Sequence, residues 1–386
     1  MRKSLILFPW LFPLLWDEDN KMRLGEASQI HPTRGVLNMK KISVITCIMA
    51  ALLMLAGTAS ATDYVGSEKC FSCHAEQFNL WQATGHPWKL RKVEKARYAK
   101  LPLPPGYSWD DISYVIGGAN KKARFIDKNG YIITAAKDGS EAKTQYNIED
   151  GSWSFYHKGE KKPYKCGPCH MTAYSAEGNQ DGMEGMIGTW AEDGISCEEC
   201  HGPGGEHLKK PSKATIAINR SAEACGKCHQ RGGMDPAPPA SGGFIKHHEQ
   251  INELKAGVHK DLACIECHNP HDRAINAKNN CAECHEDVAA GYAKTTHGKQ
   301  GTRCVECHMP KASKSAISVA SYTGDVRTHI FKINTDADAD MFKTIEENGK
   351  KSTFAKNFVT VDYACLSCHG SRDKAWAAKN AKDFHK

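Results

Sequence analysis

Sixteen of the 17 cysteines fall into eight short units, each with two cysteines separated by two residues and followed directly by a histidine. The eight C-x-x-C-H units are Cys70/Cys73/His74, Cys166/Cys169/His170, Cys197/Cys200/His201, Cys225/Cys228/His229, Cys264/Cys267/His268, Cys281/Cys284/His285, Cys304/Cys307/His308 and Cys365/Cys368/His369. Two thiols at this spacing can each form a thioether with one vinyl group of a haem, and the adjacent imidazole then coordinates its iron. The sequence therefore predicts eight covalently bound c-type haems with these histidines as proximal ligands.

Two other uses of paired cysteines fit the pattern less well. Disulfide frameworks and redox C-x-x-C pairs do not need a following histidine, yet one follows every pair although histidine is only 19 of 386 residues. Zinc ribbons combine two C-x-x-C units in one site and have no use for a histidine after each of them. The recurrent histidine therefore favours haem attachment.

The second axial ligand of each iron decides between electron transfer and catalysis. An electron carrier has both axial positions filled, whereas a haem enzyme leaves one open for its substrate. Outside the eight units and His31, ten histidines remain. The better candidates for distal ligands are His86, His207, His248, His259, His271, His297 and His329.

Some of these assignments stay open at this point. His248 stands for the adjacent pair His247 and His248, of which a helix would direct only one toward a haem. The eighth distal ligand is left among His157, His385 and the other member of that pair. Because Pro270 turns the chain, His271 is expected to face a neighbouring haem. Alanine at His271 should create a high-spin haem, and alanine at His385 should not.

The N-terminal residues carry the pattern of an export signal. Residues 1–38 are interpreted as an upstream extension or a misassigned start. Residues 39–61 combine Lys40 and Lys41, an apolar run over 42–56 and the small residues 59–61, which is the order of a cleavable signal peptide. The alternative is a retained membrane anchor, for which the apolar run is short. We therefore expect a periplasmic, cell-surface or extracellular protein.

The spacing of the units divides the remaining chain into three parts. Residues 62–165 are predicted to form an N-terminal lobe with one haem, residues 166–310 a compact core with six, and residues 311–386 a C-terminal segment with one. Hydrophobic residues make up 40% of the chain and the mean hydropathy is −0.53. The expected fold is mostly α with much irregular structure, around a core packed by the haems themselves.

A few local patterns predict regular structure. The β-rich runs 123–126 and 131–134 flank Asn129-Gly130, which predicts a small β-hairpin in the N-terminal lobe. The proline- and glycine-rich residues 235–243 indicate a loop or linker. Residues 245–256 and 373–384 are predicted to be helical.

Four stretches around the units resemble a known family. Residues 64–70 (YVGSEKC), 197–204 (CEECHGPG), 264–271 and 304–311 (CVECHMPK) resemble the multihaem cytochromes c of the hydroxylamine-oxidoreductase superfamily, which includes the nitrifier tetrahaem electron carrier and exported octahaem cytochromes. This resemblance implies closely spaced haems in parallel and perpendicular pairs, most of them bis-histidine ligated. No C-x-x-C-K unit is present, so the lysine-ligated catalytic haem of pentahaem nitrite reductases has no counterpart.

The leading functional hypothesis is a multihaem c-type cytochrome that transfers electrons along eight bis-histidine haems in anaerobic respiration. Its expected partners are redox proteins, such as a quinol-oxidising membrane complex or other multihaem cytochromes, with at most peripheral membrane contact. The formal charge of +7 does not indicate nucleic-acid binding, because the haem propionates would outweigh it. The alternative is a reductase or oxidase of a small nitrogen or sulfur compound at one open haem.

Overall fold

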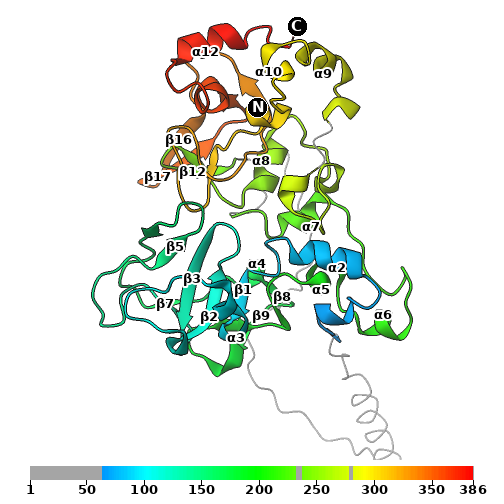
Figure 1. The fold of residues 1–386 in the computed structure, drawn as a ribbon, viewed down its shortest axis with the longest axis vertical. Coiled ribbons are helices and arrows are strands. Elements are labelled where there is room, and N and C mark those ends of the chain that lie inside the picture. Colours follow the sequence, from blue (N-terminus) through cyan, green and yellow to red (C-terminus); the bar gives the residue numbers. More distant parts are fainter. Residues whose placement is uncertain (1–62, 232–236, 278–280, 386) are drawn as a thin grey trace, which may run out of the picture. The chain divides into compact units, whose positions relative to one another are not determined.

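The computed structural model describes residues 63–231, 237–277 and 281–385 (Figure 1). The predicted export segment therefore lies outside the described residues. The structure contains 28% helix and 21% strand, so the prediction of a mostly α fold holds only loosely and sheet is more abundant than expected. None of the helices in the described ranges has the length and apolar content that crossing a membrane requires.

The helices are short, and several of them are the cysteine units themselves. One helical turn brings residues i and i+3 to the same side, which is where the two thiols of a unit must lie to reach one haem. This holds for α4 (Gly167–His170), α5 (Cys197–His201) and α11 (Cys304–His308). The other α-helices are α2 (Ala75–Gln82), α3 (Val93–Ala96), α6 (Gly205–Lys209), α7 (Ala222–Gly226), α8 (Gln250–Ala256), α9 (Glu286–Tyr292), α10 (Thr296–Lys299) and α12 (Lys374–Ala381).

The predicted hairpin is present, and it belongs to a larger sheet. Strands β3 (Lys122–Asp127) and β4 (Tyr131–Ile132) are antiparallel, with Ile126 opposite Ile132. The Asp127 side chain accepts hydrogen bonds from the backbone N–H groups of Asn129 and Tyr131, both at 2.9 Å, which closes the turn. The sheet follows the order β1-β2-β3-β4-β7, with β5 paired to β3 and β6 to β5. Its other strands are β1 (Leu90–Lys92), β2 (Ile112–Gly117), β5 (Gln145–Asn147), β6 (Trp153–Ser154) and β7 (Lys162–Pro163).

Alternation along β3 gives this sheet two different faces. Ala123 and Phe125 are buried in one apolar cluster, and Ile126 is buried in a second cluster with Tyr114 and Tyr164. Lys122 and Arg124, two residues apart, share one face of the strand, because successive side chains of a strand point to opposite sides. The sheet thus carries two cations in register on one of its surfaces.

A second sheet replaces part of what was predicted to be loop and helix. It has the order β14-β13-β12-β17-β16, formed by β12 (Pro239–Ser241), β13 (Phe244–Lys246), β14 (Ser313–Lys314), β16 (Phe342–Glu347) and β17 (Lys350–Ala355). The predicted loop 235–243 therefore contains a strand, and the predicted helix over 245–256 begins only at Gln250. Phe244 and Ile245 are buried in this sheet, and His248 has a left-handed backbone (φ 68°) that separates strand from helix.

The remaining elements are small. Helix α12 lies within the predicted 373–384, and the Asp373 side chain caps it by accepting from the N–H of Trp376 at 2.7 Å. By their contacts, residues Thr62–Lys386 form one unit. The short strand pairs are β8 (Met171–Thr172) with β11 (Glu192–Asp193), β9 (Ser175–Asn179) with β10 (Ile187–Thr189), and β15 (Ile333–Asn334) with β18 (Val359–Thr360).

Candidate haem-binding centre

One continuous cavity of about 3750 Å³ runs through the described unit. Its lining includes both cysteines and the histidine of every one of the eight units. Ligand pockets usually measure about 300–1,000 Å³, so this cavity has room for several large groups. All sixteen cysteines are free thiols, and no group of three or more His, Cys, Asp or Glu side chains converges as a metal site in the described ranges. These observations fit haem attachment better than disulfides or zinc.

The units touch one another through their cysteines. The thiols of Cys70 and Cys197 interact directly, as do those of Cys169 with Cys228, Cys225 with Cys264 and Cys281 with Cys304. Three further pairs lie within electrostatic range of each other: Cys200 and Cys225, Cys267 and Cys281, and Cys307 and Cys365. With the units numbered in sequence order, these pairs connect the first unit to the third, and then the third to the eighth one after another. The second unit is connected to the fourth, as a branch of this series.

Imidazole rings from different elements face each other across the cavity at a distance that suits one metal between them. Metal–imidazole bonds are about 2.0 Å long and the bonding nitrogen lies about 1.1 Å from the ring centre, so two rings on opposite sides of one metal have centroids about 6.2 Å apart. Seven of the eight proximal histidines have a second histidine ring at 5.7–6.3 Å. The pairs are His74–His207 (6.3 Å), His201–His271 (6.1 Å), His229–His86 (6.3 Å), His268–His329 (6.1 Å), His285–His259 (5.9 Å), His308–His385 (5.7 Å) and His369–His297 (5.8 Å).

All seven predicted distal histidines thus lie opposite a proximal ring, but two of them share one. His86 is 6.3 Å and His248 is 6.2 Å from His229. The His248 ring also contacts His247 at 4.5 Å and lies within electrostatic range of His170. Burial and the neighbouring His247 lower the pKa of His248 to about 2, which keeps its imidazole in the neutral form that can bind a metal. As expected, His271 pairs outside its own unit, with the ring planes of His271 and His201 only 2° apart.

His385 lies opposite a proximal ring although it is not among the seven preferred candidates. It was kept among the open choices for an eighth ligand, yet its replacement was expected to have no effect. The structure sets its ring against that of His308. His157, another open choice, is exposed, pairs with Glu160 at 2.9 Å and has no proximal ring opposite it. The only sequence signal for His385 is its position four residues after the last residue of α12, Ala381.

His170 is the one proximal histidine without a second imidazole at such a distance among the described residues. Its surroundings are cationic instead. Burial, followed by the charges of Lys89, Arg124 and Lys122, lowers the pKa of His170 to about 3. The same three cations line the cavity together with Arg231 and Tyr156.

The strand β3 supplies two of these cations. Arg124 donates from Nε to Gln145 at 2.8 Å and stacks over the Tyr156 ring at 3.6 Å. Lys122 donates from Nζ to the Ser315 carbonyl at 2.6 Å. Burial, followed by the charge of Arg124, lowers the pKa of Lys122 to about 7, against the opposing effect of Asp325. A negatively charged group in this part of the cavity would relieve the mutual repulsion of these cations.

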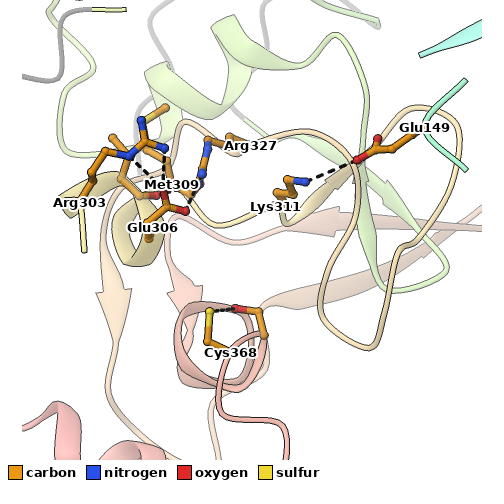
Figure 2. A network of polar contacts seen from close by, with 9 residues as sticks. Glu149, Arg303, Glu306, Met309, Lys311, Arg327 and Cys368 are labelled. Carbon is orange, nitrogen blue, oxygen red and sulfur yellow. Dashed lines mark hydrogen bonds and ion pairs between the residues drawn. The ribbon is translucent and has the colours of Figure 1, made fainter. Parts of the chain in front are cut away.

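Hydrogen bonds fix the orientation of the units. In the seventh unit, Glu306 lies between the two cysteines and accepts from Arg303 and Arg327, both at 2.6 Å (Figure 2). Arg327 also donates to the carbonyls of Val305 and Met309 at 3.0 and 2.9 Å, which holds α11 in place. In the third unit, Glu198 is only 3% exposed and accepts backbone N–H groups of Val65, Gly66 and Gly204. In both the third and the seventh unit, a carboxylate within the C-x-x-C segment itself thus holds the segment in place.

Two stretches of the chain match family models of haem proteins. Residues 189–286 match cytochrome c3, and residues 132–202 match cytochrome c554 and c-prime. Together these stretches contain the second to the sixth unit, which agrees with the reading of the C-x-x-C-H units as haem sites.

Similar proteins are also multihaem cytochromes. The dissimilatory sulfite reductase MccA of Wolinella succinogenes is 25% identical over 380 residues, covering 80% of this chain and 48% of MccA. The multiheme cytochrome MtrA of Shewanella baltica is 26% identical over 192 residues, covering 45% of this chain and 52% of MtrA. The chain thus spans about half the length of the curated relatives that it matches.

Solved structures show the same fold. The octaheme sulfite reductase MccA of Wolinella succinogenes superimposes with a TM-score of 0.61 at 20% identity, covering 79% of this chain and 65% of MccA. The outer cell wall cytochrome OcwA superimposes with a TM-score of 0.53 at 21% identity, covering 82% of this chain and 86% of OcwA. The chain is therefore similar in sequence and fold to multihaem c-type cytochromes, and this similarity implies covalently bound haem c at C-x-x-C-H units.

Proposed function

We propose that this chain is an exported cytochrome that binds eight haems and conducts electrons between redox partner proteins. The observation that carries this proposal is the set of facing imidazole rings, which would supply two ligands to the iron of each of seven haems. Bis-imidazole ligation suits electron transfer because it leaves no position for a substrate. It also lacks the methionine that raises haem potentials, so the carrier is proposed to work at low potential.

The contacts between units support a continuous route. Haems attached to neighbouring cysteines would have their edges close together, and each unit has a cysteine within electrostatic range of a cysteine in at least one other unit. Electrons would enter and leave at the ends of this series, which are the units of His74 and His369. The partners proposed for these ends are a quinol-oxidising membrane complex and other multihaem cytochromes.

The test uses the mature holoprotein, made in a host that attaches c-type haems. Mass spectrometry should show eight haem adducts on one chain. Electron paramagnetic resonance of the oxidised protein should show low-spin ferric signals from at least seven of them. Fewer adducts, or high-spin iron at several haems, would contradict conduction through eight haems. The N-terminus of the same material tests the proposed removal of residues 39–61.

A second function is favoured by the surroundings of His170: reduction of a small oxoanion at the haem of Cys166, Cys169 and His170. No imidazole faces His170 at ligand distance in the described residues, and Lys89, Lys122 and Arg124 surround it with positive charge. MccA, which matches over 80% of this chain, is a sulfite reductase, and this similarity supports a sulfur oxoanion as substrate.

The residues of this site suit such chemistry. When bound, the haem supplies an iron that delivers electrons from its neighbours to the substrate. Removal of one oxygen atom as water takes two electrons and two protons, and the three cations can hold the anion in place while this occurs. Lys122 can also hold a proton at Nζ, because its pKa of about 7 lets the ammonium and the amine exchange near neutral pH.

One experiment separates the two functions. Sulfite is added to the oxidised holoprotein, with nitrite as a second probe, and the spin state of the irons is followed by electron paramagnetic resonance. An open haem gives a high-spin signal that the anion changes, and Arg124→Ala should weaken that change. If His248 binds the iron of His170, all eight haems are low-spin and neither anion has an effect. That result leaves electron conduction as the function.

A further inference from the structure

A buried carboxylate lies beside one of the paired imidazoles. Glu253, on α8, is 1% exposed. Its Oε2 accepts the backbone N–H of His329 and lies 3.6 Å from Nδ1 of the same residue. Its Oε1 accepts the Ser313 hydroxyl at 2.8 Å. The Glu253 carboxylate therefore accepts two hydrogen bonds, lies next to Nδ1 of the His329 imidazole, and is almost completely shielded from solvent.

Three of the other paired rings have neutral neighbours at Nδ1. His201 and His308 donate to the backbone carbonyls of Ala217 and Phe331, both at 2.8 Å. His229 contacts the Gln250 side chain at 3.2 Å. Among the described histidines that face a proximal ring, only His329 has a carboxylate within ion-pair distance.

We propose that Glu253 is a positioning residue that lowers the reduction potential of the haem held by His268 and His329. A carboxylate next to the N–H side of a metal-bound imidazole makes that imidazole a stronger donor. It also favours the iron state with the higher positive charge, and burial strengthens this attraction because little water screens it. Both effects stabilise the oxidised iron over the reduced one.

A lowered reduction potential at this haem would affect the whole series, because the haem lies in its interior. The unit of His268 is the fifth, in the interior of the series, between the units joined through Cys225–Cys264 and Cys267–Cys281. A low potential there keeps electrons off the fifth haem at rest, so that they reside on either side of it. Glu253 then divides the route into two pools joined by an uphill step. This inference rests on the proposed conduction and not on catalysis at His170.

The test is a potentiometric titration of the holoprotein with Glu253→Gln. The amide keeps an oxygen for the Ser313 hydroxyl and removes the negative charge. We expect about one-eighth of the haem absorbance change, the share of one of the eight units, to move from the low end of the titration to higher potential. All haems that were low-spin should stay low-spin. Ser313→Ala is the matched control, since it removes a hydrogen-bond partner of Glu253 without changing its charge. This variant should show the same reduction potentials as the unmodified protein.

Three results would overturn the proposal. These are an unchanged titration in Glu253→Gln, an equal shift in Ser313→Ala, and the appearance of a new high-spin haem, which would mean that Glu253 only holds His329 on the iron. If the glutamine variant does not accumulate, Glu253→Asp keeps the charge and should retain the low potential. Loss of conduction itself is recognised separately, by missing haem adducts or high-spin iron in the unmodified protein.

Discussion

The imidazole ring of His385 lies 5.7 Å from that of His308, and the two ring planes are 18° apart. This separation and the near-parallel planes would let the two rings bind one iron from opposite sides. We therefore expect His385→Ala to convert one haem to high spin and to lower the thermal midpoint of the holoprotein. His157→Ala is the control, because His157 faces no proximal ring. Electron paramagnetic resonance compares the two, and identical low-spin spectra would exclude His385 as a ligand.

The two rings near His229 lead to a second prediction. His86 interacts with His229 but not detectably with His170, whereas His248 is within range of both. We expect His86→Ala to open the iron of His229 and add one high-spin haem. If the spectrum is unchanged, His248 is the ligand of that iron, and the imidazole of His86 has a structural role only.

Anion binding near His170 should depend on pH through Lys122. Burial and the charges of Arg124, Arg231 and Lys89 lower the pKa of Lys122 to about 7, and only Asp325 acts in the opposite direction. Only the protonated form attracts an anion, so sulfite affinity should be highest below pH 7 and should fall as the pH rises through that value. Lys122→Met should flatten this dependence and weaken binding roughly tenfold, about 1.4 kcal/mol. Spectroscopic titrations at several pH values check both points.

Glu198 offers a test of stability. Its carboxylate binds three backbone N–H groups that join residues 65–66 to the third unit and the turn after it. Glu198→Gln keeps one carbonyl oxygen but presents an NH₂ group to a donor, which should cost about 2 kcal/mol of unfolding free energy. Glu206→Gln, on the exposed side of α6, should change stability little. Denaturant unfolding of the holoprotein measures both, and equal midpoints would rule out this bracing role.

Some features of the candidate haem-binding centre can be predicted from the sequence because they are formed by residues that are close together along the chain. The thiols and imidazole of a unit fall within five consecutive residues, and a single turn such as α5 or α11 is enough to align them. The hairpin at Asn129-Gly130 and the helix after Asp373 are equally local, since each depends on side chains within four residues. The expectation that His271 faces away from its own unit is also local, because it depends on the adjacent Pro270.

The rest depends on how distant segments meet. His385 reaches His308 from 77 positions away (385 − 308), and no pattern in the sequence indicates that approach. Lys122 and Arg124 look like ordinary charged residues of a strand, and only the fold sets them beside His170. The strands β12 and β13 were missed because prolines and glycines suggested a loop, whereas the buried Phe244 and Ile245 decided in favour of the sheet.

Among the interactions described above, the second unit is connected to the others only through Cys169, which interacts with Cys228 of the fourth unit. The fourth unit also interacts with Cys200 of the third unit and with Cys264 of the fifth. If the chain conducts electrons as proposed, their route from the first unit to the eighth does not include the haem of His170. Loss of the His170 haem would then leave this route complete. If the route were interrupted on one side of the fourth unit, electrons could still reach the His170 haem from the other side.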